Sequence, residues 1–198
     1  MALPFLRRAE AAVDSIKPAD INELKGMRQA VDTTRLIMDT IHILFQRPLD
    51  PVKPKAMNIL KQECPFVGDS FDNCTKTTLA SALFLKDLFD FSNNEKDNIN
   101  EETIELLEPY LLFTAPDGRE IFTGAVAKKS SSALEGMCVW AAAMSDYHKQ
   151  SKIVKPKLEA LRLAEARLQD AQRELDKAEQ KLQVCQDVLD KLKDDFEA

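Results

Sequence analysis

The sequence is poor in the residues on which most catalytic and ligand sites depend. Its 198 residues include 5 glycines and 2 histidines, and it contains no GxxxxGK[ST] phosphate loop. Neither His42 nor His148 stands in a recognisable metal-ligand spacing with a carboxylate or a cysteine. We therefore expect a chain that is not itself an enzyme, with no catalytic residue, no metal and no cofactor.

Cysteines and long apolar runs are also scarce. The four cysteines, at positions 64, 74, 138 and 185, show no CxxC spacing, which favours reduced thiols and a cytosolic compartment over a Cys64–Cys74 disulfide. No apolar run approaches the ~20 residues of a membrane span, and the first residues lack the apolar segment of a signal peptide. The sequence predicts a cytoplasmic protein without a membrane partner.

Positive charge is not in excess. The net charge is −6, and the acidic side chains concentrate between Asp87 and Glu108. Binding to phosphate backbones requires a cationic face, so we expect no nucleic-acid partner. A local basic patch is still able to meet an acidic protein surface.

The last quarter of the chain is rich in regularly spaced apolar residues. From Leu161 to Phe196 they recur in alternating steps of three and four, which is the seam of a coiled coil. Between Val154 and Ala164 the spacing slips by one residue, a stammer near Leu161. A second and shorter seam, Leu6, Ala9, Val13 and Ile16, precedes Pro18.

A helix with such a seam needs a partner helix to bury it. The two seams flank the middle of the chain, so they predict an antiparallel two-helix coiled coil. The shorter seam covers only the first part of the longer one, which leaves residues from about 167 onward without a partner in this chain. We therefore expect a piece of a longer protein, with a truncated first helix.

The residues between the seams predict a small helical bundle, so that the fold class is all-α with a small β-hairpin insertion. The expected helices are 18–26, 32–45, 79–91, 98–108 and 124 onward into the long helix, with one or two helical turns at 56–61. Residues 62–78 predict a loop, and the turn Ala115–Arg119 between β-prone runs predicts a hairpin at about 112–123. The expected parts are 1–17, 18–150 and 151–198.

Four stretches resemble the microtubule-binding domain of dynein heavy chains. Ala12–Lys25 is similar to the start of that domain, and Arg35–Asp39 and Ser131–Trp140 follow in the same order. Val154–Leu161 resembles the exit into the second stalk helix. The resemblance covers essentially the whole chain.

The type of heavy chain is also suggested. Axonemal heavy chains resemble this chain in two places, the long stretch between Gln46 and Leu79 and the sequence of Asn98–Glu102. Within that group the resemblance is greatest to the outer-arm γ-type. The resemblance implies a helical tip on an antiparallel coiled-coil stalk, which binds α/β-tubulin with an affinity set by the stalk register. It also implies an ATP-driven parent motor in the axoneme of a cilium or flagellum, a part of the cytoskeleton.

The resemblance assigns roles to individual residues. It implies that Pro18 and Pro156 form the hinge between stalk and tip, and that a leucine-rich-repeat light chain docks on the tip. An exposed hairpin is a candidate contact for that accessory partner, through Phe113, Ile121 and Phe122. The implied tubulin-binding residues are Lys17, Lys25, Arg28, Lys128 and Lys129.

Two other function classes remain open. In the first, the long helix dimerises and the bundle binds a protein other than tubulin. In the second, the chain is a helical arm that belongs to a larger enzyme and binds RNA. Residues 147–198 carry equal numbers of acidic and basic side chains, which disfavours the second class because an RNA-binding arm requires a basic stripe.

Overall fold

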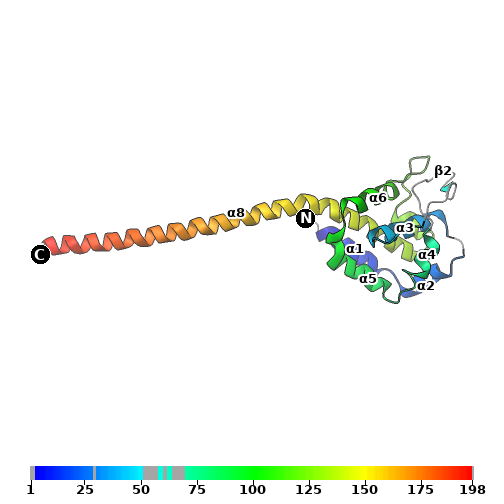
Figure 1. Cartoon of the computed structure of the whole chain (residues 1–198), viewed down its shortest axis with the longest axis horizontal. Coiled ribbons are helices and arrows are strands. Elements are labelled where there is room, and N and C mark those ends of the chain that lie inside the picture. Colours follow the sequence, from blue (N-terminus) through cyan, green and yellow to red (C-terminus); the bar gives the residue numbers. More distant parts are fainter. Residues whose placement is uncertain (1–2, 29, 51–57, 60–61, 64–69, 198) are drawn as a thin grey trace. The chain divides into compact units, whose positions relative to one another are not determined.

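The fold is built from helices that divide into two compact units (Figure 1). The computed structural model describes residues 3–28, 30–50, 58–59, 62–63 and 70–197. The units are Met1–Ser151 and Lys152–Ala198. The last helix, α8 (Ser132–Glu197), begins in the first unit and continues through the second.

The elements follow in this order along the chain. They are α1 (Leu3–Asp14), α2 (Pro18–Gly26), α3 (Asp32–Leu44), β1 (Asn58–Ile59), β2 (Gln62–Glu63), α4 (Phe71–Lys76), α5 (Phe84–Asp90), the π-helix η1 (Phe91–Glu95), the 3₁₀-helix η2 (Lys96–Asn98), α6 (Glu101–Leu111), α7 (Gly124–Lys128) and α8. Strands β1 and β2 form an antiparallel pair, with Asn58 opposite Glu63 and Ile59 opposite Gln62.

Local sequence signals determine where several helices begin. Pro18 occupies the first turn of α2, where its missing N–H costs no hydrogen bond. The side chain of Asn100 caps α6 by accepting a 2.8 Å hydrogen bond from the N–H of Thr103. Thr123 caps α7 in the same way, through the N–H of Val126 at 3.3 Å.

Helices α1 and α8 run antiparallel within the first unit. A Cβ on Gly136 would lie 2.4 Å from Cγ1 of Ile16 and 2.9 Å from the carbonyl oxygen of Ala12, whereas Arg8 is 3.8 Å from Asp146. The contact further along α8 thus involves the earlier residue of α1, so the two helices run in opposite directions. The sequence predicts pairing with the first part of the seam that runs from Leu161, but the observed contacts lie earlier on α8, where Gly136 allows a close approach.

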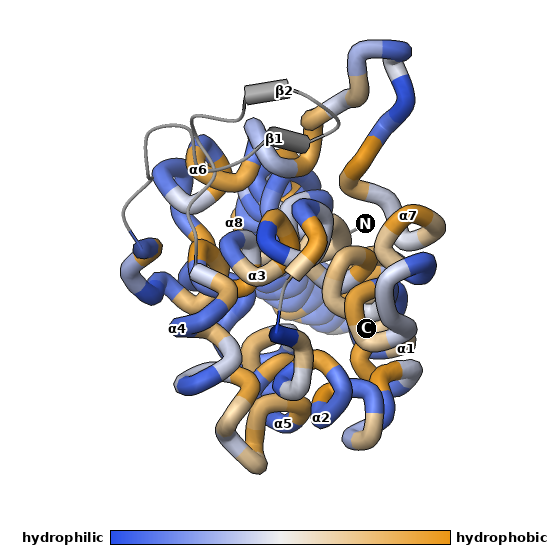
Figure 2. Tube along the Cα trace, turned by 90° about the vertical axis from the view of Figure 1, so that its right-hand side faces the viewer, coloured by the Kyte–Doolittle hydropathy of each residue, from blue (hydrophilic) through white to orange (hydrophobic). Residues whose placement is uncertain are grey.

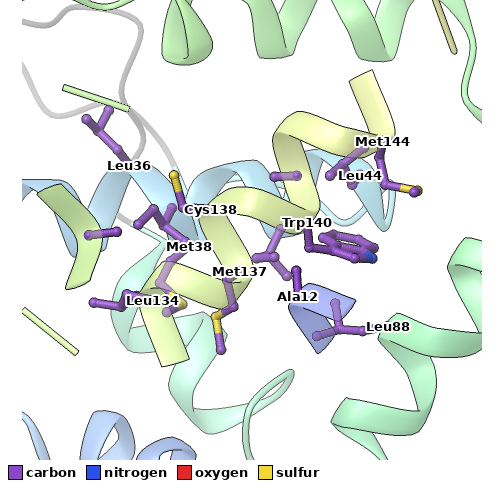
Figure 3. Close-up of a cluster of buried hydrophobic side chains, with 14 of the residues drawn as sticks. Ala12, Leu36, Met38, Leu44, Leu88, Leu134, Met137, Cys138, Trp140 and Met144 are labelled. Atoms are coloured by element: carbon purple, nitrogen blue, oxygen red, sulfur yellow. The ribbon is translucent and has the colours of Figure 1, made fainter. Parts of the chain in front are cut away.

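The core of the first unit lies around α3 and the first part of α8. Figure 3 shows side chains from α1, α3, α5 and α8 meeting around Trp140, which is fully buried. Its ring lies 5.6 Å from that of Phe91 and 5.9 Å from that of Phe45, centroid to centroid. Figure 2 shows that hydrophobic residues recur along α1, α2, α5 and α6, the helices that surround this core.

The second unit consists of the remainder of α8. From Lys152 to Asp194 every side chain is exposed except the half-buried Val154. The heptad leucines Leu161, Leu168, Leu175, Leu182 and Leu189 are each more than half exposed. The predicted seam is thus present on a helix whose apolar face has no cover within the described residues.

The structure corrects the predicted loop at 62–78. Residues 62–63 form β2 and residues 71–76 form α4, while 64–69 lie outside the described residues. Phe71 and Cys74 are buried, and Cys74 Sγ lies 3.4 Å from Met38 Sδ. This packing stabilises a helix despite polar residues typical of a loop. The expected helical turns at 56–61 are also wrong at 58–59, which are extended.

The predicted hairpin at 112–123 is reduced to a turn. One isolated antiparallel bridge joins Thr114 to Glu120, and the N–H of Ala115 donates to the carbonyl of Arg119 at 2.8 Å. Gly118 turns the chain with a φ of 81°. No named strand lies in this segment, because the flanking apolar side chains turn inward instead of pairing along two strands.

Three predicted helices have different limits. The helix expected at 79–91 begins only at Phe84 and passes into the π-helix η1 after Asp90. Helix α6 passes Pro109 and ends at Leu111. The helix expected from Gly124 breaks between Lys128 and Ser132.

Candidate functional site

Two segments distant in sequence meet at the start of α8. The hydroxyl of Ser132, in the first turn of α8, donates a hydrogen bond to Oδ2 of Asp20, in the first turn of α2. Ile16, just before α2, packs against Gly136 one turn further along α8. The segment Ile16–Asp20 is therefore held against the beginning of α8, and we call this meeting point the α2–α8 corner.

The first group of predicted tubulin-binding residues lies on or next to α2. Lys17 precedes Pro18 directly, Lys25 lies in the last turn of α2, and Arg28 follows that helix. All three side chains are exposed. Lys25 also borders a groove of about 320 Å³ between α2 and the segment 80–85.

The second group lies at the break between α7 and α8. Lys128 ends α7, and its Nζ is 3.1 Å from Oε2 of Glu135 in the first turn of α8. Lys129 borders a second cavity, of about 340 Å³, which Val31 and Asp32 also line. Burial raises the pKa of Asp32, although Arg35 opposes this shift. The corner thus brings α2 and the α7–α8 break together, while Lys25 and Lys129 border different cavities.

One basic residue near this site was not predicted. Arg119, in the turn after Ala115, lines the same cavity as Lys129, and its Nε lies 2.6 Å from Oδ2 of Asp117. The hydrogen bond from the backbone N–H of Arg119, followed by this side-chain contact, holds the pKa of Asp117 below its ordinary value. Only the fold brings the turn beside α7, so no periodicity in the sequence signals Arg119.

The three apolar residues assigned to an accessory partner do not form an exposed cluster. Ile121 and Phe122 are 6% and 7% exposed, and Phe113 is half-buried against the same core. The expectation of exposed side chains is wrong for Ile121 and Phe122, because the turn packs its apolar residues onto the bundle. The large apolar side chain that this segment does expose is Leu112, at 65%.

The two predicted hinge prolines occupy different environments. Pro18 begins α2 immediately before the α2–α8 corner. Pro156 lies inside α8, five residues after Ser151, the last residue of the first unit. A proline inside a helix removes one backbone hydrogen bond, and the helix nevertheless continues on both sides of this one.

Several buried polar side chains form hydrogen bonds within the core. Asp39 accepts hydrogen bonds from the backbone N–H of Ser70 at 3.2 Å and the hydroxyl of Tyr110 at 3.0 Å. Trp140 Nε1 donates to the hydroxyl of Ser92 at 2.8 Å, and that hydroxyl donates to the carbonyl of Leu88. These contacts tie α3, α6, η1 and α8 together and expose no reactive group to a substrate.

The two buried thiols in the described parts of the chain, Cys74 and Cys138, are poor nucleophiles, whereas the thiol of Cys185 is exposed. Burial raises the pKa of both Cys74 and Cys138 to about 12, so both are protonated at neutral pH, whereas the thiolate is the reactive form. Within the described residues no group of three or more His, Cys, Asp or Glu side chains is placed to hold a metal ion. None of the described helices is long and apolar enough to cross a membrane.

Comparison with known proteins gives a family match along the whole chain. Residues 1–198 match the family described as "MT: Microtubule-binding stalk of dynein motor". A solved structure described as "Microtubule Binding Domain of DYNEIN-C" is similar with a TM-score of 0.56 and 33% sequence identity. That similarity covers 79% of this chain and 90% of the other.

Curated relatives are similar across nearly the same length. The dynein gamma chain of the flagellar outer arm from Chlamydomonas reinhardtii is 36% identical over 93% of this chain. Dynein axonemal heavy chain 3 from Homo sapiens is 33% identical over 99% of it. In both cases the match covers 4% of the relative.

Proposed function

Because the chain belongs to the family of microtubule-binding stalks of dynein motors, we propose that it binds tubulin through the α2–α8 corner. The contact of Ile16 with Gly136 supports this proposal most directly. It holds the segment before α2 against the first turns of α8, which follow the α7–α8 break. In this proposal the two basic segments together bind an acidic partner.

The proposed tubulin contacts are the exposed cations at this corner. Lys17, Lys25 and Arg28 would act from α2, and Lys128 and Lys129 from the α7–α8 break. Lys128 is the weakest contributor, because Glu135 already occupies its ammonium group. The proposed role is electrostatic binding, which the match to the family of microtubule-binding stalks supports.

The affinity would depend on the register between α1 and α8. The two helices pack most closely where Gly136 meets Ile16, and α2 follows α1 after three residues. A shift of α1 along α8 would move α2 with it and change the spacing of the cations. Pro18 and Pro156 are the proposed hinge positions of this transmission.

The proposed setting is an axonemal dynein heavy chain in a cilium or flagellum, as in the curated relatives. The remainder of such a heavy chain, which carries the ATPase activity of the motor, would be the permanent partner of α8. The exposed heptad leucines of the second unit support pairing with another helix.

Microtubule co-sedimentation of the 198-residue chain across a salt series tests the tubulin assignment. We expect binding that weakens as the ionic strength rises, and further weakening by Lys25→Ala and Lys129→Ala. Lys149→Ala is the matched control: Lys149 also lies on α8, about 25 Å along the helix from Ser132, and pairs with Glu108 at 3.7 Å.

Two results would contradict the proposal. One is a chain that stays in the supernatant at low salt even when an antiparallel partner helix is fused to α8 and fixed in register. The other is an equal loss of binding with Lys149→Ala, which would show a general charge effect instead of a defined surface.

A leucine-rich-repeat light chain is a further proposed partner. Because Ile121 and Phe122 are buried, the proposed contact is the exposed rim of the turn, at Leu112 and Arg119. Leu112→Glu should reduce capture of a purified light chain, with Leu83→Glu, just before α5, as the matched control because Leu83 is 58% exposed. Equal capture by both variants would remove Leu112 from the contact.

A further inference from the structure

The α2–α8 corner contains an acidic residue among its cations. Asp20 lies in the first turn of α2, three residues after Lys17, and is half-buried. A negative charge here opposes binding to an acidic surface such as the one proposed for tubulin. Its presence therefore calls for a structural reason.

The structure gives Asp20 a specific partner. Its Oδ2 accepts the hydrogen bond from the hydroxyl of Ser132, the first residue of α8. These two residues are 112 positions apart in the sequence. The bond therefore joins the two segments that carry the proposed tubulin-binding cations.

The other contacts of the corner do not fix the orientation of the first turn of α2 relative to α8. The packing of Ile16 on Gly136 fixes the end of α1 against α8, but Ile16 precedes α2. Ile21 and Leu24 anchor the inner face of α2 in the core. Apolar packing is non-directional, whereas a hydrogen bond fixes an orientation, so the bond sets how the first turn of α2 faces α8.

We propose that Asp20 and Ser132 are positioning residues for microtubule binding, which hold the cations of α2 at a fixed spacing from those of the α7–α8 break. This inference rests on the proposed function. Asp20 acts through the hydrogen bond it accepts, and its charge is a cost that the surface tolerates.

Substitutions at the two positions separate the hydrogen bond from the charge. Ser132→Ala removes the donor and keeps the carboxylate, and Asp20→Ala removes both acceptor and charge. Asp20→Asn removes the charge, but its amide oxygen still accepts from the hydroxyl. Ser132→Thr keeps a hydroxyl and is the conservative rescue. Ser130→Ala is the matched control, because Ser130 is a half-buried serine two positions away.

The experiment measures the dissociation constant of each variant from microtubules at one low salt concentration, together with its thermal unfolding. A net hydrogen bond corresponds to roughly a two- to tenfold change in an equilibrium constant. We expect Ser132→Ala to weaken binding by that factor, with the helical content unchanged. Ser132→Thr, Asp20→Asn and Ser130→Ala should bind at least as tightly as the parent chain.

The double variant provides the second test. If the two residues act through one bond, Asp20→Ala should cause no further loss of binding in the Ser132→Ala background. Unchanged or tighter binding by Ser132→Ala would overturn the inference. Tighter binding by both Asp20→Ala and Asp20→Asn would also overturn it, because it would assign Asp20 a purely electrostatic role.

The lysine variants separate this inference from the proposed function. If Ser132→Ala, Lys25→Ala and Lys129→Ala all leave binding unchanged, the proposed function itself fails. If the two lysine variants weaken binding while Ser132→Ala does not, this inference alone fails.

Discussion

Gly136 is the residue on which the packing of α1 against α8 depends most directly. Any side chain at this position would meet Ile16 and the backbone carbonyl of Ala12 at distances that real Cβ atoms do not reach. The backbone atom is the stricter obstacle, because it cannot move without the whole helix. The close approach of the two helices therefore requires glycine.

We expect Gly136→Ala to lower the stability of the first unit by about 1–3 kcal/mol, the usual cost of overpacking. Thermal unfolding followed by circular dichroism measures the change. Gly26→Ala is the control, because a Cβ there meets no atom within 4 Å. An equal effect of the two substitutions would contradict the steric explanation.

Ser92 satisfies the indole N–H of Trp140 in the core. Ser92→Ala leaves this buried donor without its partner, which should cost about 1–3 kcal/mol. Trp140 is the only tryptophan of the chain, so its fluorescence in a urea titration reports on this site alone. In a Trp140→Phe background, followed by circular dichroism, Ser92→Ala should cost less because no indole N–H remains. An equal cost in both backgrounds would be the contrary result.

His42 links stability to pH. Burial lowers the pKa of His42 below the ordinary 6.5, and Arg47 adds to this effect, although the carbonyl of Pro48 and Asp50 oppose it. The unfolded chain therefore binds a proton near pH 6.5 that the folded chain does not yet bind. The contribution of neutral His42 to the free energy of unfolding is complete above about pH 6.5, and it is lost as the pH drops below that value.

We expect the free energy of unfolding to decrease by up to about 1.4 kcal/mol per pH unit below pH 6.5 through this residue. Urea titrations between pH 7.5 and 5.5 measure the slope. His42→Gln should flatten it, whatever its effect at pH 7.5, whereas His148→Gln serves as the control for the other histidine. The same slope in His42→Gln as in the parent chain would contradict the prediction.

Among the secondary-structure elements, those set by local chemistry were predicted and those set by tertiary packing were not. Asn100 begins α6 and Pro18 begins α2 because each acts within its own first turn. Helix α4 was missed because its polar residues are typical of a loop, and only burial of Phe71 and Cys74 stabilises it. The hairpin was overestimated because β-prone residues such as Ile121 pack inward instead.

The site was predictable to a similar extent. Family resemblance singled out the cations of α2 and the α7–α8 break, and their roles in tubulin binding stay predictions. The contact between Asp20 and Ser132 joins residues 112 positions apart, and no pattern in one sequence carries that information. Arg119 was missed for the same reason, because only the fold places its turn beside Lys129.

The exposed seam of the second unit predicts self-association of the isolated chain. Leu182 lies in the heptad seam and Val184 lies outside it, although both are about 60% exposed. We expect sedimentation velocity to detect concentration-dependent association that Leu182→Asp abolishes, because a charge cannot be buried in the seam. Val184→Asp should leave the association intact, and equal loss with both variants would mean that the seam is not the contact.

For the whole molecule, the proposed mechanism predicts that the register of α8 with a partner helix changes microtubule affinity. An antiparallel partner helix fused to residues 152–198 in two registers, four residues or ~6 Å apart, provides the test. We expect dissociation constants that differ by about fivefold or more. Thermal unfolding of the first unit should be the same in both fusions, and equal affinities would contradict transmission along the stalk.

The π-helix η1 has a consequence for the ancestry of the chain. Its i→i+5 hydrogen bonding holds one more residue in a turn than an α-helix does. The segment Phe91–Glu95 is therefore what a single-residue insertion into α5 would produce, and Ser92 within it accepts the hydrogen bond from Trp140. A homologue with one residue fewer between Leu88 and Lys96 should continue α5 as an ordinary helix. Such a homologue should also lack a hydroxyl at the position that meets the tryptophan.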